Sequence, residues 1–263
     1  MYEDYENIKN LYELGFSTTE ISKMLHLGKS SVAYALHSLN VDLSNEYDYR
    51  QYIVDDNFFN LIDTEEKAYI VGFIMADGYV SESTNQISIT LKHTDEYILK
   101  QMLIAMNSNV AIQHVTNSLG QVYSRINICS KQMVSDLVNM GLVQNKSLIL
   151  KSPQNIPDHL YHHLVRGYFD GDGSIWFDNK TKNYHINFVG TEDVLTAFRE
   201  KMNWNNLTIR NACKNQQITK RMDYSGNISV SNKLEKLYKN ATIYLTRKHE
   251  KYLLCKQLAN KNK

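Results

Sequence analysis

The sequence is poor in cysteine and has no apolar stretch long enough to cross a membrane. Its three cysteines, Cys129, Cys213 and Cys255, are far apart and odd in number, which argues for reduced thiols in an intracellular protein and against a zinc cluster. The longest apolar run, Ala68 to Ala76, is far shorter than the roughly 20 residues that span a bilayer. No signal peptide precedes the first expected helix. We therefore expect an intracellular, cytoplasmic protein with no membrane partner.

The chain also has almost no net charge, but its charges are unevenly distributed. The total is +1, yet residues 1–66 contain four basic and thirteen acidic residues, a charge of −9. The remaining residues contain 25 basic and 15 acidic residues, a charge of +10. A basic region of this kind favours binding to a polyanion, although a generally charged, soluble surface would look similar.

Two nine-residue segments, Ile70–Gly78 and Val165–Gly173, resemble each other. Corresponding glycines and aspartates in them are separated by the same interval of 95 residues. A repeat at a fixed interval predicts two similar units in tandem.

Both segments have the pattern of a helix that ends in an aspartate. Ile70, Phe73, Ile74 and Asp77 follow the spacing of one helical face, and the next residue, Gly78, is a good helix stop. Each helix also carries two small residues four positions apart, which would let two backbones approach closely. These small residues are Gly72 and Ala76 in the first copy and Gly167 and Gly171 in the second.

Packing of the two helices side by side would bring Asp77 and Asp172 together at their C-terminal ends. Each carboxylate would lie at the negative end of a helix dipole, so the two would repel each other. A divalent cation removes this repulsion, and oxygen ligands at this place suit Mg²⁺. The pattern therefore predicts a Mg²⁺ site for phosphodiester hydrolysis, although either segment alone could be an ordinary buried helix.

Both segments resemble the motif of the LAGLIDADG homing endonucleases, in the single-chain form with two motifs. The resemblance covers about Glu66 to about Leu253 and is better in the second copy. It implies an α+β fold of two tandem, pseudo-symmetric αββαββα units, with the motif helices at their interface and antiparallel sheets on double-stranded DNA. It also implies that Asp77 and Asp172 are the catalytic metal ligands, holding Mg²⁺ or Mn²⁺ as a substitute, in a monomer. The first copy has Met75 where the motif has an earlier aspartate, a position that does not bind metal.

Lys92 ends an expected strand, just before a helix that begins near Thr94. The resemblance implies a catalytic lysine there, which would stabilise charge near the scissile phosphate or orient the attacking water. Aligning Thr94 with Thr191 puts Val189 opposite Lys92. The second half then lacks this lysine, and the two DNA strands would be cut unequally. A solvated lysine at the end of a strand is the alternative.

Between the repeats, polar and apolar residues alternate, as in strands with one exposed face. Such polar faces could read base edges in a DNA major groove, although any antiparallel sheet with one wet side has the same pattern. The expected DNA-binding residues are Gln86, Ser88, Thr90, Tyr123, Arg125, Asn127, His185, Asn187, Arg210 and Lys214.

The N-terminal segment has the pattern of two short helices joined by a turn. Ser17 to Glu20 forms a capping box that opens the first helix, and Ser30 to Leu39 predicts a second. This arrangement resembles a helix-turn-helix, but His26 stands where a turn glycine is usual, and the segment is acidic. A helical bundle or a partner-binding module is the alternative. The residues that would contact DNA are Lys29, Ser30, Ser31 and Tyr34.

These patterns divide the chain into four parts. They are a helix-turn-helix-like domain over residues 1–41, a linker over 42–65, a first LAGLIDADG unit over 66–157 and a second over 158–263 with a C-terminal helix. The basic residues from Thr246 to Lys251 are expected on the exposed side of that last helix.

The function that the sequence favours is a site-specific double-strand DNA endonuclease. A calcium loop is excluded, because Ile175 and Thr181 occupy the sixth and twelfth positions of the loop that begins at Asp170, where an EF-hand needs Gly and Glu. A non-cutting regulator on the same scaffold stays open, since a family of bacterial sporulation regulators joins a LAGLIDADG scaffold to a helix-turn-helix. An RNA maturase, which would bind RNA, also stays open.

Overall fold

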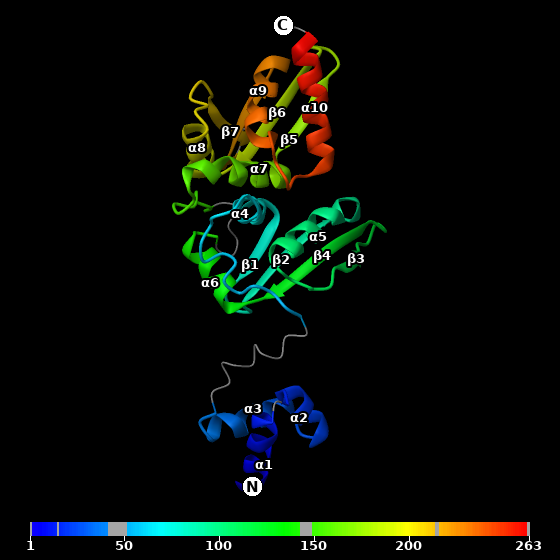
Figure 1. The fold of residues 1–263 in the computed structure, drawn as a ribbon, viewed down its shortest axis with the longest axis vertical. Coiled ribbons are helices and arrows are strands. Elements are labelled where there is room, and N and C mark those ends of the chain that lie inside the picture. The colour runs from blue at the N-terminus through cyan, green and yellow to red at the C-terminus, as the bar shows by residue number, and fades with distance from the viewer. Residues whose placement is uncertain (1, 15, 42–51, 143–148, 214–215, 262–263) are drawn as a thin grey trace. The chain divides into compact units, whose positions relative to one another are not determined.

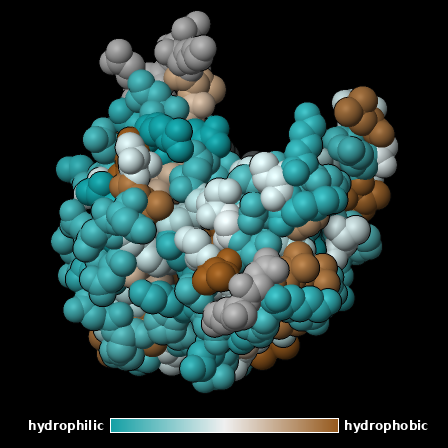
Figure 2. Space-filling view, turned by 90° about the horizontal axis from the view of Figure 1, so that it is seen from above, coloured by the Kyte–Doolittle hydropathy of each residue, from teal (hydrophilic) through white to brown (hydrophobic). Residues whose placement is uncertain are grey.

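The computed structural model describes residues 2–14, 16–41, 52–142, 149–213 and 216–261 (Figure 1). The chain divides into two compact units, Met1–Tyr52 and Ile53–Lys263, each of which is described by itself. No described helix is long and apolar enough to cross a membrane. On the face shown in Figure 2, most of the surface is hydrophilic and the hydrophobic residues are scattered.

The N-terminal unit contains α1 (Tyr2–Glu13), α2 (Thr18–Met24) and α3 (Lys29–Ser38). The predicted capping box is present, because the side chains of Ser17 and Glu20 each accept a hydrogen bond from the other residue's backbone N–H. The helices enclose a small apolar core of Ile8, Ile21, Val32, Ala35 and Leu36.

The turn between α2 and α3 contains His26 in the left-handed region, with φ of 52°. Glycine adopts this region more readily than any residue with a side chain. The chain therefore makes the turn at the predicted place, with histidine in the conformation that a glycine usually takes.

The first half of the larger unit has the element order αββαββα. Its four strands form one antiparallel sheet in the order β1-β2-β4-β3. The elements are α4 (Glu65–Asp77), β1 (Gly78–Ser81), β2 (Gln86–Lys92), the 3-10 turn η2 (His93–Asp95), α5 (Glu96–Ala105), β3 (Gln113–Thr116), β4 (Val122–Cys129) and α6 (Lys131–Asn139).

The second half repeats this order and adds one helix. Its sheet has the equivalent strand order β5-β6-β8-β7, so the prediction of two tandem αββαββα units is confirmed. The elements are the 3-10 turn η4 (Asp158–Leu160), α7 (Tyr161–Asp172), β5 (Ser174–Asp178), β6 (Asn183–Gly190), α8 (Glu192–Lys201), β7 (Ile209–Cys213), β8 (Gln216–Ser225), α9 (Asn227–Tyr238) and α10 (Thr246–Lys261).

The two halves meet where α4 and α7 lie against each other (Figure 1). The Cβ atom that Gly72 lacks would lie 2.0 Å from the carbonyl oxygen of Leu164, and that of Gly167 would lie 2.0 Å from the carbonyl oxygen of Tyr69. Leu164 precedes Gly167 by three residues in α7, and Tyr69 precedes Gly72 by three residues in α4. The two contacts are therefore symmetric. Any side chain at either glycine would collide with backbone.

A buried arginine joins the two halves. Arg166 is fully buried, and its guanidinium donates hydrogen bonds to Glu65 Oε1 at 2.6 Å, Ile243 O at 3.0 Å and Leu237 O at 2.9 Å. It also donates to His163 Nδ1 at 2.6 Å. Burial, and then the charge of Arg166, lower the pKa of His163 to about 3, so this imidazole is neutral and acts as an acceptor.

The predicted linker over residues 42–65 is too long at its C-terminal end. Residues 42–51 lie outside the described residues, but the segment that follows packs onto the larger unit. The backbone N–H of Ile53 donates to Asn109 Oδ1 at 2.6 Å. Acidic residues make this segment look polar in the sequence, whereas four of its apolar side chains are buried: Val54, Phe58, Phe59 and Ile62.

We expect Gly72→Ala to destabilise the protein by about 1–3 kcal/mol or more, because the new methyl group clashes with backbone atoms, which cannot move away as a flexible side chain can. Gly171→Ala should also destabilise, since its Cβ would lie 2.4 Å from the Cβ of Ala76. Here the colliding atom is a side chain, so adding Ala76→Gly should restore much of the loss. Thermal unfolding of the two single variants, and of each combined with Ala76→Gly, tests this. Equal rescue of Gly72→Ala by Ala76→Gly would contradict it.

Stability should fall in acid partly through His163. The unfolded state binds a proton at this residue below about pH 6.5, whereas the folded state does so only near pH 3. The unfolded state therefore gains protons first, and the free energy of unfolding decreases as pH falls through this window. Between about pH 7 and about pH 4.5, the free energy of unfolding measured in urea should fall by about 1–2 kcal/mol less for His163→Asn than for the unmodified chain. An equal loss in both proteins would contradict this assignment.

Candidate metal and nucleic-acid site

α4 and α7 each end in an exposed aspartate, and the two ends lie together (Figure 1). A Cβ atom on Gly171 would lie 3.5 Å from Asp77 Oδ2, so this carboxylate is next to the last turn of α7. Burial raises the pKa of Tyr168, and the charges of Asp172 and Asp77 raise it further. Both acids therefore lie near one side chain, as their positions in the repeats predict.

Asp170, the earlier acid of the second motif, is buried and has a different role. The hydroxyl groups of Tyr69 and Tyr238 donate hydrogen bonds to its carboxylate at 2.9 and 2.5 Å, and the backbone N–H of Leu245 donates at 2.7 Å. The equivalent residue in α4 is Met75, which is buried. Asp170 therefore connects α7 and α9 of the second half to α4 of the first half, and it does not offer an exposed ligand.

The side chain of Lys248 lies at the C-terminal end of α7. Its side chain is buried, and Nζ donates to the carbonyl oxygens of Phe169, of Asp170 at 2.8 Å and of Gly173 at 2.5 Å. The backbone N–H of Gly173 also donates to Phe169 O, at 2.9 Å. The ammonium group adds donors at this helix end, where the carbonyl groups outnumber the backbone N–H groups. Burial lowers the pKa of Lys248 to about 8, although Asp170 opposes this shift.

The position of Lys248 corrects the expectation that the residues from Thr246 to Lys251 are exposed. Sequence reasoning missed this lysine, because its spacing on α10 does not distinguish it from the exposed basic residues beside it. The charges of Asp77 and Asp172 also act on Lys248. A buried cation therefore lies near both exposed acids.

Lys92 is exposed at the last position of β2. Gly78, the first residue of β1, pairs with Ile89, so Lys92 extends beyond the start of β1. It therefore lies at the end of the sheet where Asp77 leaves α4.

The second half has a different counterpart for Lys92 than the sequence alignment predicted. Ser174 pairs with Asn187, and this register places Thr191 at the position of Lys92, not Val189. Thr191 is buried and caps α8. The alignment was wrong because the hairpin of the second half is longer, but the second half still lacks a lysine at this place.

In each sheet, the cross-strand row that continues from the motif aspartate has an arginine on the third strand of that row. Thr90 pairs with Arg125 in the first sheet, and Val189 pairs with Arg221 in the second. Arg125 Nε donates to Thr90 Oγ1 at 2.9 Å, whereas the Arg221 guanidinium forms a 2.5 Å ion pair with Asp223. Sequence reasoning missed Arg221, although the alternation of outward Arg221 and Asp223 with buried neighbours on β8 is a signal for it.

The polar face of the first sheet carries the predicted residues of β2 and β4. They alternate with buried side chains and lie on the side away from α5 and α6. They are Gln86, Ser88, Thr90, Tyr123, Arg125 and Asn127. Asn127 Nδ2 donates to Gln113 Oε1 on β3 at 3.1 Å, so Gln113 joins this face.

The polar face of the second sheet carries a stacked pair of rings. His185 stacks on Trp176, with ring centroids 5.2 Å apart and an angle of 12°, and Asn187 follows it on β6. Arg210 lies on β7, opposite Arg221. Lys214 lies outside the described residues.

In the N-terminal unit, the predicted DNA-contacting residues lie on α3. Lys29, Ser30 and Ser31 form its exposed first turn, and Tyr34 is 67% exposed. Val32, Ala35 and Leu36 face the core instead, so α3 presents one polar face.

The fold is similar to that of solved LAGLIDADG proteins. The meganuclease I-SmaMI, bound to uncleavable DNA, has a TM-score of 0.50 and 14% identity, covering 77% of this chain and 92% of that one. The homing endonuclease I-WcaI, bound to its DNA recognition sequence, has a TM-score of 0.48 and 14% identity, covering 75% and 88%. The N-terminal LAGLIDADG domain of DUF199/WhiA has a TM-score of 0.44 and 17% identity, covering 70% and 89%. No family model and no curated protein sequence matches the chain. At these identities, the similarity shows a shared fold.

Proposed function

We propose that this protein is a metal-dependent, site-specific DNA endonuclease. The observation that carries the proposal is the pair of exposed carboxylates, Asp77 and Asp172, at the adjoining ends of α4 and α7. One acid comes from each half, so a single chain supplies the whole pair and would act as a monomer.

The residues at the ends of these helices fit a hard divalent cation. The available ligand atoms are carboxylate and carbonyl oxygens, which Mg²⁺ prefers and Mn²⁺ accepts. Asp77 and Asp172 would hold the ion. When bound, it would supply charge neutralisation at the scissile phosphate and a more acidic water as nucleophile.

Other residues of the chain have roles that follow from their positions. Lys92 lies at the same end of the first sheet as Asp77 and would neutralise phosphate charge. Arg125 and Arg221 would contact the DNA backbone on either side, and the polar faces of the two sheets would select the sequence.

A non-cutting DNA-binding regulator is a second candidate, and the N-terminal unit favours it. α2 and α3 enclose a turn at His26, and α3 presents an exposed polar face. Such a unit could recognise a DNA site without cleavage. In the endonuclease, the same unit would add to DNA binding.

We expect Mg²⁺-dependent double-strand breaks when the full chain is incubated with a DNA library, with the ends mapped by sequencing. Asp77→Asn and Asp172→Asn should each lower cleavage by about a hundredfold, since each removes a charged metal ligand. Asp158→Asn is a matched control, because Asp158 is exposed and paired with Lys201 at 2.6 Å.

Strand-resolved sequencing extends this experiment to Lys92. Because Thr191 replaces this lysine in the second half, Lys92→Ala should slow cleavage of one strand more than the other. Specific DNA binding without Mg²⁺-dependent breaks would overturn the nuclease and support the regulator. Preferential binding to structured RNA would instead support a maturase.

Removing Arg125 or Arg221 should weaken binding to a mixed-sequence DNA duplex. If each arginine neutralises one phosphate, Arg125→Ala and Arg221→Ala should each reduce the slope of log affinity against log salt by about one. Lys131→Ala is the control, because Lys131 begins α6 on the opposite side of the first sheet. Fluorescence anisotropy over a salt series measures the slopes, and unchanged slopes would contradict the contact.

A further inference from the structure

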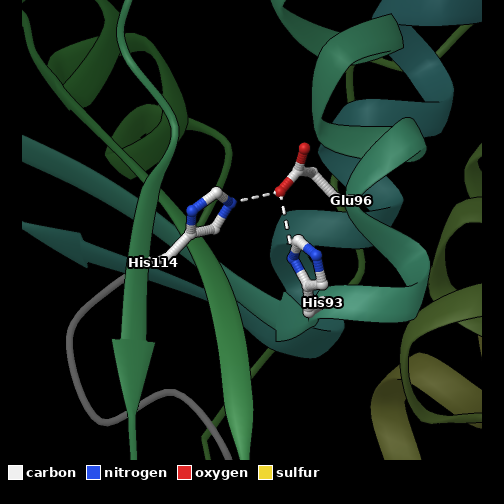
Figure 3. A group of neighbouring side chains, drawn as sticks. All are labelled: His93, Glu96 and His114. Carbon is white, nitrogen blue, oxygen red and sulfur yellow. Dashed lines mark hydrogen bonds and ion pairs between the residues drawn. The ribbon is translucent and has the colours of Figure 1, made fainter.

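Three ligand-type side chains gather on the helix side of the first sheet, away from the paired aspartates. They are His93 of η2, Glu96 of α5 and His114 of β3 (Figure 3). One ligand atom from each lies within 4.8 Å of the other two.

The fold brings these residues together for identifiable reasons. His93 and Glu96 are three residues apart where η2 continues into α5, so they lie on the same helical face. His114 pairs with Ser124. Ser124 is buried on the side of β4 that faces α5, so His114 lies on that side too.

One oxygen of Glu96 is the centre of the cluster. Glu96 Oε2 lies 2.5 Å from His114 Nε2 and 3.2 Å from His93 Nδ1, and it accepts a hydrogen bond from Ser124 Oγ at 2.7 Å. Lys100 Nζ lies 2.8 Å from the other oxygen, Oε1. Hydrogen bonds from Lys100, His114 and Ser124 lower the pKa of Glu96 to about 2, so the carboxylate is ionised.

The cluster is open to solvent on one side. The side chains of His93 and His114 are each 53% exposed, whereas that of Glu96 is 15% exposed. The carboxylate is therefore held in place, while an ion and a water molecule can approach from the side of the imidazoles (Figure 3).

We propose that His93, Glu96 and His114 bind a divalent transition metal ion of the Zn²⁺ type. Two imidazole nitrogens and one carboxylate oxygen form a set of three protein ligands that Zn²⁺ accepts, with water in the fourth position. Mg²⁺ prefers oxygen ligands alone, so this cluster and the paired aspartates differ in their metal preference.

The geometry is close to what tetrahedral binding needs. Bonds of about 2.0–2.2 Å place tetrahedral ligand atoms about 3.3–3.5 Å apart. His93 Nδ1 and Glu96 Oε2, at 3.2 Å, already match this spacing. The 2.5 Å separation of His114 and Glu96 must widen, which rotation of the exposed imidazole allows.

Metal binding would fix the edge of the first sheet. β3 is an edge strand that pairs with β4 alone, and all four of its residues are exposed. A metal ion would link its His114 to Glu96 on α5. The other side of β3 carries Gln113, which contacts Asn127 on the polar face, so the ion would stabilise that face from behind.

Titration of the untagged full chain with CoCl₂ and ZnCl₂ tests the site. We expect one equivalent of Co²⁺ to give the visible absorption of a four-coordinate complex, and ZnCl₂ to displace it. His93→Ala, His114→Ala and His114→Gln should each weaken affinity by about tenfold or more. His114→Gln keeps a side-chain amide donor for Glu96, so it separates metal binding from the hydrogen bond.

Two controls make the outcome specific. His159→Ala should bind as the unmodified chain does, because His159 is exposed and lies in η4. The double variant Asp77→Asn, Asp172→Asn should also keep the visible absorption of the four-coordinate Co²⁺ complex, whether or not the protein cuts DNA. Unchanged affinity in His114→Ala, or no Co²⁺ complex in the unmodified chain, would overturn the proposal.

Hydrogen exchange provides a second, independent readout. ZnCl₂ should slow amide exchange in residues 113–116, because the ion ties β3 to α5, and His114→Gln should abolish this protection. Exchange in β3 that does not respond to ZnCl₂ would contradict the structural role of the ion.

Discussion

The larger unit depends on a backbone contact between α4 and α7. At Gly72 and Gly167 the carbonyl oxygen of the opposite helix occupies the space of a missing side chain. Because the two contacts are symmetric, the helices run past each other in one fixed register and end together. Their last residues, Asp77 and Asp172, are therefore neighbours, although 95 residues separate them in the sequence. The same contact that holds the halves together creates the candidate metal site.

A site with two exposed acids at helix C-terminal ends concentrates negative charge. The chain offsets part of it with Lys248, whose buried ammonium caps the carbonyl groups at the end of α7. Arg166 plays a comparable part at the other end of the interface, where it bonds to Glu65 of the first half. Both cations are buried, and their hydrogen bonds to carbonyl or carboxylate oxygens compensate for the loss of hydration.

The two halves share a fold, but they differ in chemistry. The second half has a buried Asp170 where the first has Met75, and Thr191 where the first has Lys92. The first half alone, among the described residues, brings two histidines and a glutamate together behind its sheet. Both halves do keep an arginine at the equivalent position of the row that continues from the motif aspartate, Arg125 in the first and Arg221 in the second. A symmetric scaffold can therefore carry functions that belong to one half only.

The sequence by itself determined the repeat, the two helices with their C-terminal aspartates, the alternating strands and the capping box at Ser17. These features follow from local spacing, which the chain carries wherever it folds. Only the tertiary structure decided that residues 53–62 pack onto the larger unit, that Lys248 is buried, and that His114 meets Glu96. It also decided that Arg221 and Arg125 are equivalent. These facts depend on strand register and on contacts between distant segments, which local patterns do not contain.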